Sequence, residues 1–224
     1  MLEIIAMSVE DAISIEECGA DRIELVSALT EGGLTPSFGL IDEVIKSVNI
    51  PVNVMIRHHA KSFMYSESDI SIMLKDIEKV KELGANGIVI GMLDKENNIE
   101  ENQLKTIISA SKGLEITFHR AIDETNLLNS IDVINRYNEI TNILTSGGKG
   151  KVIDNTDYIN TLKNKSKHAK VLLGGGLNFE NIEQIKKLTN NKDFHFGTAV
   201  RVDKNPFGEI DKVKLKKLVN IIND

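Results

Sequence analysis

The sequence GADRIEL at residues 19–25 returns as GANGIVI at residues 84–90. In each copy three residues separate the glycine from a segment of mainly apolar side chains. Glycine commonly ends a helix, because it adopts the left-handed backbone conformation without strain. Each copy therefore predicts a helix that ends near Gly19 or Gly84 and leads into a buried strand.

Short apolar runs of the same kind recur along the whole chain and predict eight strands. They cover residues 2–7, 22–25, 52–56, 87–90, 115–119, 142–145, 170–173 and 193–196. The stretches between them carry apolar residues three and four positions apart, as at Ile182, Ile185 and Leu188 or at Ile70, Leu74 and Ile77, which predicts helices. Strands that alternate with helices are typical of βαβ units and a parallel sheet.

Eight such units predict an α/β fold, a single (β/α)8 TIM barrel that occupies residues 1–224. A doubly wound open sheet is the alternative. The first strand is not followed by the Gly-x-Gly-x-x-Gly pattern of dinucleotide-binding folds, which favours the barrel. No low-complexity segment or change in composition suggests a second domain.

The composition restricts the partners that we expect. The net charge is −6, and no basic run interleaved with aromatic residues is present, so neither nucleic acid nor an anionic membrane surface is an expected partner. The single cysteine, Cys18, excludes an intramolecular disulfide and fits a reducing compartment. No apolar run reaches 18 residues and the first residues do not resemble a signal peptide, so we expect a cytoplasmic protein.

The active-site residues of TIM-barrel enzymes lie at the C-terminal ends of the strands. Glu24 lies at the end of the second predicted strand, either as a base or ligand or as the partner of Arg22 in an ion pair on the same strand face. His119 ends the fifth strand, where an imidazole can act in acid–base chemistry. Arg120 beside it would lower its pKa, and Asp123 could orient either residue. Glu24, His119 and Asp123 are the predicted catalytic residues.

A second group of strand-end residues predicts a site for an anionic ligand. Arginine binds anions through a fork of donors, and glycine lets backbone N–H groups approach a ligand closely. Glycine turns follow three neighbouring strands, and an inward-facing histidine precedes the last of them. The predicted ligand-binding residues are Arg57, Arg120, Ser146, Gly147, Gly175, Gly176, His195 and Gly197.

The sequence identifies no metal ligands. His58 and His59 are adjacent, and they are either solvated loop residues or ligands. A Cu(I) ion favours thiolate, thioether and imidazole donors, but the chain has no Cys-x-x-Cys or Met-x-x-Met spacing.

Several segments together resemble the CutC family of copper homeostasis proteins: residues 19–25, GADRIEL; 31–37, EGGLTPS; 54–57, VMIR; 63–66, FMYS; 117–123, TFHRAID; and 144–147, LTSG. The resemblance spans about residues 1–200 and implies a cytoplasmic TIM barrel, usually a homo-oligomer, with copper as its possible ligand. Val26 and Met64 stand where the family often has cysteine, and Arg57-His58-His59 replaces a commoner Arg-Pro-Arg.

Two functions therefore compete, and a regulatory or scaffold role is a third hypothesis. The resemblance implies copper homeostasis with a bound copper ion. The strand-end residues favour an enzyme of isomerase or lyase type that acts on a small anionic, possibly phosphorylated, metabolite at the C-terminal face of the barrel.

Overall fold

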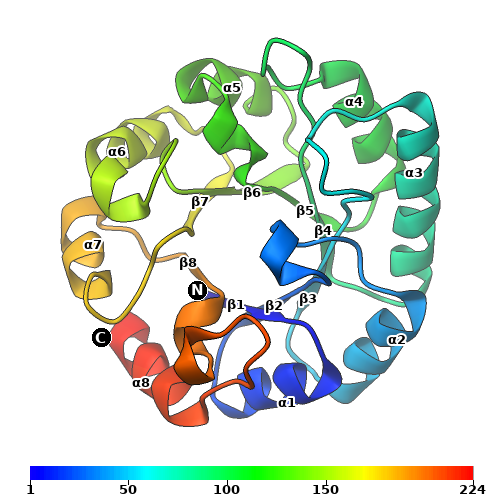
Figure 1. The fold of residues 1–224 in the computed structure, drawn as a ribbon. Helices are drawn as coiled ribbons and strands as arrows, with labels where there is room; N and C mark the ends of the chain where they lie inside the picture. The colour runs from blue at the N-terminus through cyan, green and yellow to red at the C-terminus, as the bar shows by residue number, and fades with distance from the viewer. Residues whose placement is uncertain (224) are drawn as a thin grey trace.

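The computed structural model describes residues 1–223, and it confirms the predicted barrel. Eight parallel strands are hydrogen-bonded in the order of the sequence, and the eighth closes the barrel against the first (Figure 1). The strands are β1 (Leu2–Ala6), β2 (Arg22–Leu25), β3 (Val52–Met55), β4 (Gly87–Ile90), β5 (Glu115–Phe118), β6 (Ile140–Thr145), β7 (Lys170–Leu173) and β8 (Phe194–Phe196).

A helix follows each strand, and together the helices form the outer ring seen in Figure 1. They are α1 (Val9–Glu17), α2 (Phe38–Ser47), α3 (Glu67–Glu82), α4 (Glu101–Ala110), α5 (Leu127–Ile134), α6 (Thr156–Lys165), α7 (Ile182–Thr189) and α8 (Lys212–Asn223). Short 3-10 helices occupy loops at the C-terminal ends of strands: η1 (Leu29–Glu31), η2 (Arg120–Glu124), η3 (Val152–Asn155), η4 (Thr198–Val200) and η5 (Val202–Lys204).

Local signals explain where several helices begin and end. The hydroxyl of Ser66 accepts a hydrogen bond from the N–H of Asp69, and the Asp69 carboxylate accepts one from the N–H of Ser66, so α3 begins with a capping box. Gly19 and Gly84 follow α1 and α3 with φ angles of 86° and 84°. Both glycines end their helices in the way that the repeated motif predicted.

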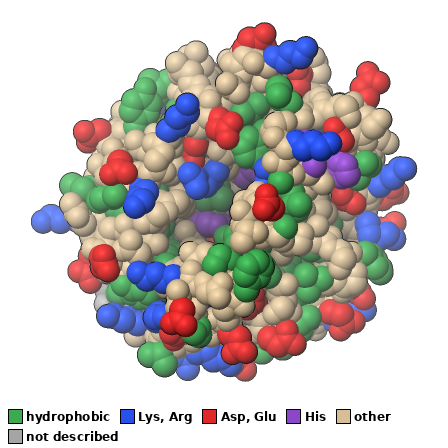
Figure 2. Space-filling view, in the orientation of Figure 1, with side chains coloured by type: hydrophobic (Ala, Val, Ile, Leu, Met, Phe, Trp, Pro, Cys, Tyr) green, Lys and Arg blue, Asp and Glu red, His purple; other side chains and the backbone are tan. Residues whose placement is uncertain are grey.

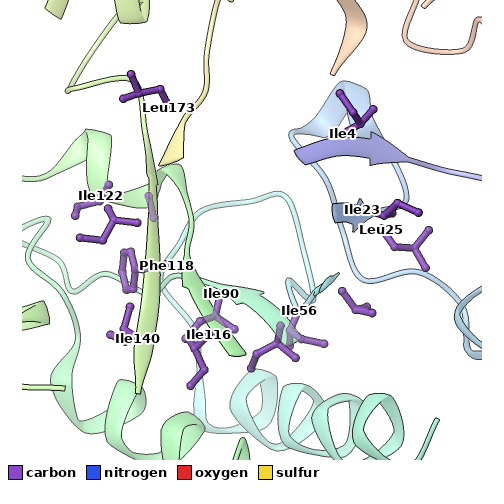
Figure 3. Close-up of a cluster of buried hydrophobic side chains, with 14 of the residues drawn as sticks. Ile4, Ile23, Leu25, Ile56, Ile90, Ile116, Phe118, Ile122, Ile140 and Leu173 are labelled. Carbon is purple, nitrogen blue, oxygen red and sulfur yellow. The ribbon is translucent and has the colours of Figure 1, made fainter. Parts of the chain in front are cut away.

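The main hydrophobic core lies between the strands and the helices. The side chains that form it come from alternate strand positions and point outward, as Ile4, Ile23, Leu25 and Ile90 do in Figure 3. This layer is mainly aliphatic, with Phe118, Phe194 and Phe196 among its members. It holds the helices against the barrel and leaves the inward-facing positions free for other residues.

The interior of the barrel is polar toward its N-terminal half. Buried side chains there include those of Glu3, Arg22, Asn53 and Thr117. The small apolar cluster of Ile5, Val26, Met55 and Val89 lies closer to the C-terminal end. A TIM barrel usually fills its interior with branched aliphatic residues, and the polar filling of this barrel departs from that pattern.

Two smaller expectations need correction. Leu188, which we placed on the buried face of α7, is 47% exposed, and Thr189 is buried in its place. The sixth strand begins at Ile140, two residues earlier than predicted. Within residues 1–223, no helix has the length and apolar character needed to cross a membrane.

Candidate functional site

A cavity of about 340 Å3 opens at the C-terminal mouth of the barrel. Figure 2 shows the hollow at the centre of this face, with histidine side chains inside it and Lys or Arg side chains near its rim. Its lining includes Glu24 on β2 and His195 on β8, together with Arg57, His119 and Arg120 from the loops after β3 and β5. The volume is at the lower end of the range for small-molecule sites.

Four buried charged or titratable side chains, those of Glu3, Arg22, Glu24 and His195, form a cluster next to the cavity, and the half-exposed Glu115 contacts it. The guanidinium of Arg22 donates to Glu3 at 2.6 Å and to Glu115 at 3.1 Å. His195 Nδ1 lies 2.7 Å from Glu3 Oε1 and 3.5 Å from Glu24 Oε2. Arg22 thus pairs with Glu3 and Glu115, and the predicted Arg22–Glu24 ion pair is wrong.

Glu24 is the carboxyl group of this cluster that reaches the cavity. Its side chain is 3% exposed, and its Oε2 atom has no hydrogen-bond partner among residues 1–223. Burial raises the pKa of Glu24 to about 7, although the nearby His195 opposes the shift. Glu24 and Glu3 in turn raise the pKa of His195, against the effect of burial. Glu24 is therefore the group of this cluster whose pKa lies near neutral pH.

Glu3, Glu24 and His195 each place one potential ligand atom within 4.8 Å of the others. In this structure the His195 ring nitrogen is hydrogen-bonded to Glu3, and Arg22 already supplies a positive charge to the same carboxylate. A shared proton satisfies this arrangement, and we assign no metal ligands here. The donors are also harder than those that Cu(I) favours.

His119 lines the cavity in a defined tautomer. Its Nδ1 atom accepts a hydrogen bond from the N–H of Ala121 at 3.1 Å, so the neutral ring carries its proton on Nε2. Nε2 is buried and has no partner among the described residues. Burial, and then the positive charge of Arg57, lower the pKa of His119 to about 3. We had expected Arg120 to lower it, and that attribution is wrong.

Arg57 is held beside His119 by backbone carbonyls. Its Nη1 donates to Glu31 O at 2.7 Å and to Gly33 O at 3.1 Å, while Nε has no partner within residues 1–223. The guanidinium lies 4.9 Å from the centre of the Phe63 ring, which in turn lies 5.0 Å from the His119 ring. Because Arg57 is only 6% exposed, its position is fixed before any ligand binds.

Arg120 is held by a different set of contacts. Its Nε donates to Asp123 at 2.8 Å and its Nη2 donates to Ser146 Oγ at 3.0 Å. Asp123 also accepts hydrogen bonds from Thr145 Oγ1 and from the Ser146 N–H and hydroxyl. Asp123 and Ser146 therefore position Arg120, and neither of them lines the cavity. Asp123 makes no contact that orients His119.

The three glycine turns differ in what their N–H groups do. The N–H of Gly147 donates to Thr145 Oγ1, and the N–H of Gly148 donates to Asp123, so this turn is satisfied internally. Gly175, Gly176 and Gly197 line the cavity, and the described residues contain no acceptor for their N–H groups. The turns after β7 and β8 can therefore donate to a ligand, whereas the turn at Ser146 and Gly147 cannot.

The remaining candidates lie away from the cavity. His58 is exposed and His59 is half-buried, and their Nε2 atoms lie 3.5 and 3.6 Å from the carboxylate of Asp69 at the start of α3. Neither histidine lines the cavity. Cys18 lies at the C-terminal end of α1, where its thiol contacts Lys212 O at 3.7 Å.

Sequence reasoning missed two residues that shape the site. Phe63 separates Arg57 from His119, and Glu3 holds both Arg22 and His195. The role of Glu3 could have been predicted, because it is a charged residue inside the apolar run of the first strand. The role of Phe63 could not have been predicted, because nothing in the sequence distinguishes it from any other apolar loop residue.

The protein is a (β/α)8 barrel with a polar cavity among its C-terminal loops. The CutC family profile matches residues 1–200, and the chain belongs to the CutC family. It is 38% identical to a family protein CutC of Enterobacter sp. (strain 638), over 82% of this chain and 74% of that one. It is 34% identical to a family protein CutC of Pasteurella multocida, over 92% and 85% of the two chains.

Similarity to solved structures is consistent with this family assignment. A crystal structure from Streptococcus agalactiae, named as a proposed copper homeostasis protein CutC, has a TM-score of 0.82 and 30% identity, and the alignment covers 88% of this chain and 98% of that one. Phosphoribosylanthranilate isomerase of Thermotoga maritima has a TM-score of 0.69 at 16% identity, over 99% of this chain and 98% of that one, which shows a shared fold alone. Membership of the CutC family supports a role in copper homeostasis.

Proposed function

We propose that this protein is an enzyme of isomerase or lyase type that acts on a small anionic metabolite by acid–base chemistry. The observation that carries the proposal is that a buried carboxyl group and two arginines line one cavity. Glu24 has a pKa of about 7, while Arg57 and Arg120 present positive charge to the same space. An acid–base group works best when its pKa is near the working pH.

The anionic end of the substrate is assigned to the wall formed by Arg120 and the turns after β7 and β8. The Arg120 guanidinium lies so close to Gly175 that a Cβ added to this glycine would be 3.0 Å from Cζ. Free N–H groups from Gly175, Gly176 and Gly197 line the same side. Backbone amides beside an arginine bind phosphate or carboxylate, and the loops after strands 7 and 8 are a frequent phosphate site in this fold.

A Cu(I) site does not fit the residues of this cavity. The only thiol of the chain, Cys18, lies between α1 and β2, where strands begin, whereas the cavity lies where they end. His119 Nε2 carries a proton rather than a free lone pair. Met55 is the one thioether in the lining, and His195, the other imidazole there, has its Nδ1 hydrogen-bonded to Glu3. A role in copper homeostasis would then be exercised through the metabolite rather than through copper held in the cavity.

Anion binding can be tested by thermal unfolding in sulfate or phosphate against chloride at equal ionic strength. A ligand that binds the folded state raises Tm. We expect a rise for the wild type, and a reduced one for Arg57→Ala and Arg120→Ala. Arg136→Ala is the matched control, because Arg136 is exposed and pairs with Glu101 on the outer surface. Equal shifts in all four proteins would contradict the anion site.

A Cu(I) titration against a chromophoric chelator tests the alternative. We expect the metal-free protein not to compete under anaerobic, reducing conditions. Competition that is lost in His119→Ala but retained in Cys18→Ser would place copper in the cavity and overturn the assignment.

A further inference from the structure

Two titratable atoms of the buried cluster are open to the cavity. Glu24 Oε2 has essentially no accessible surface, but Glu24 Oε1 and His195 Nε2 do not belong to the buried, unpaired atoms of residues 1–223. Neither atom has a hydrogen-bond partner there, since the His195 ring bonds only through Nδ1. Both side chains line the cavity, so Oε1 and Nε2 are the atoms that a ligand can contact.

Glu24 and His195 lie on the same side of the cavity. Glu24 is on β2 and His195 is on β8, and only β1 separates these two strands in the barrel. Glu24 Oε2 lies 3.5 Å from His195 Nδ1. Glu3, on the intervening strand, lies 2.7 Å from the same nitrogen. This contact at Nδ1 orients the ring and leaves Nε2 for the cavity.

The His195 ring also lies beside the wall to which the anion is assigned. A Cβ added to Gly174 would be 3.1 Å from His195 Cδ2, the ring carbon bonded to Nε2. A Cβ added to the next residue, Gly175, would be 3.0 Å from Arg120 Cζ. The glycine turn after β7 therefore contacts both side chains. A ligand whose anionic group is held at Arg120 places its next atoms near His195 and Glu24.

From this geometry we propose that Glu24 and His195 act together as an acid–base pair that moves a proton between neighbouring carbons of a small hydroxy-carbonyl compound bearing a phosphate or similar anionic group. The inference rests on the proposed function and narrows it to isomerisation through an enediol. Because both groups lie on one side of the cavity, the proton leaves and returns on the same face of the substrate. Inversion of a stereocentre would instead need groups on opposite faces.

The reaction is balanced by these two groups. The Glu24 carboxylate takes the proton from carbon, the C–H pair forms a carbon–carbon double bond, and the carbonyl oxygen takes the Nε2 proton of His195. In the second half, the neutral His195 takes the proton of the other enediol hydroxyl, whose O–H pair forms the new carbonyl. The double-bond pair then takes the proton from Glu24 onto the neighbouring carbon. Both side chains return to their starting states, and no co-reactant is needed.

The charges of the cluster suit a base and an acid side by side. Burial raises the pKa of Glu24 to about 7, so above this pH the group is a carboxylate and a stronger base than an ordinary one. Burial lowers the pKa of His195, but the Glu24 and Glu3 carboxylates raise it by more, despite the charge of Arg22. These carboxylates thus keep on His195 the proton that the carbonyl oxygen requires.

Calorimetry with two probes that share a phosphate tests the pair. 2-Phosphoglycolate carries a phosphate and a planar carboxylate that resembles an enediolate, whereas methyl phosphate carries the phosphate alone. A ligand carboxylate beside Glu24 should hold a proton between the two groups, so 2-phosphoglycolate should take up about one proton at pH 8 and methyl phosphate clearly less. Titrations in two buffers that differ in ionisation enthalpy measure this uptake. 2-Phosphoglycolate should also bind at least about tenfold more tightly, because it contacts the acid–base pair as well as the anion wall.

Two substitutions separate the two groups. His195→Asn keeps an amide near the position of Nδ1 and removes Nε2, so it should lose most of the affinity advantage of 2-phosphoglycolate. Glu24→Gln should lose most of the proton uptake, because an amide does not titrate. His58→Gln is the matched control, since His58 is exposed and does not line the cavity, and it should behave as the wild type.

The outcomes distinguish the inference from the proposed function. If neither probe binds, the anion site is wrong and the proposed function fails together with the inference. If both probes bind with equal affinity and equal proton uptake, or if His195→Asn keeps the full advantage, the acid–base pair is wrong while the anion site stands. The proton uptake of the wild type tests the pair even if a substitution impairs folding.

Discussion

The carboxylate of Asp123 accepts hydrogen bonds from both the backbone N–H and the hydroxyl of Ser146, at 3.1 and 2.8 Å. The two residues join the loop after β5 to the loop after β6. Through this pairing, Arg120 receives a fixed position at the edge of the cavity, because its guanidinium bonds to both of them. The position of Arg120 therefore depends on a carboxylate that does not itself line the cavity.

Asp123→Ala should destabilise the protein by about 2–4 kcal/mol, because it leaves several buried donors of Thr145, Ser146 and Gly148 without an acceptor. Urea unfolding measures this cost. Ser146→Ala is the comparison and should cost only about 1 kcal/mol, since it removes the hydroxyl and leaves the carboxylate in place. A loss below about 1 kcal/mol for Asp123→Ala would contradict the network.

Glu24 should make the protein less stable as pH rises from about 4.5 to about 7. Its pKa is raised from 4.5 to about 7 in the folded state, so in this interval the folded protein keeps a proton that the unfolded chain has released. The full shift corresponds to about 3 kcal/mol. The stability of Glu24→Gln relative to the wild type should therefore rise by roughly that amount between pH 4.5 and 7.5.

Urea unfolding at several pH values checks this prediction, with His119→Gln as the control. The His119 pKa is lowered to about 3, so the wild type loses the stability linked to this group as pH falls below 6.5. Glu24→Gln should thus reduce the loss of stability between about pH 4.5 and 7, whereas His119→Gln should reduce the loss of stability below pH 6.5. A stability difference between Glu24→Gln and wild type that does not change with pH would show that Glu24 titrates normally.

Gly91→Ala should displace the His119 ring. An added Cβ would lie 2.4 Å from both Cε1 and Nδ1, which is closer than side-chain atoms can approach. We expect a cost of about 1–3 kcal/mol in unfolding free energy, measured by urea unfolding. The matched control is Gly39→Ala in α2, where no atom lies within 4 Å of the new Cβ. That variant should be neutral, or more stable by up to about 1 kcal/mol.

The Cys18 thiol should react slowly with a thiol reagent such as DTNB in the native protein. The residue is 6% exposed, and burial raises the pKa of its thiol, so little thiolate is available. Complete reaction is expected within the mixing time in concentrated urea. Rapid native labelling would show that the packing of α1 against α8 opens readily.

The barrel was predictable because its signal repeats. Eight apolar runs alternate with helical patterns, and every predicted strand corresponds to an observed one with ends that differ by at most two residues. The candidate site was predictable in its parts, since Glu24, Arg57, His119 and Arg120 were expected at strand ends and all line the cavity. The hydrogen-bond partners of these residues were not predictable. The position of a residue at a strand end does not indicate which side chain lies opposite it in the barrel.

The sequence by itself determined the alternation of strands and helices, the aliphatic outer core and the absence of an internal disulfide. These follow from periodicity and composition, which act locally along the chain. Only the tertiary structure decided that Arg22 pairs with Glu3 rather than with Glu24, and that Glu3 also holds His195, 192 positions away. Closure of the barrel brings β8 beside β1 and so places His195 against Glu3. Burial inside the closed barrel raises the pKa of Glu24 to about 7, and the nearby His195 opposes this shift.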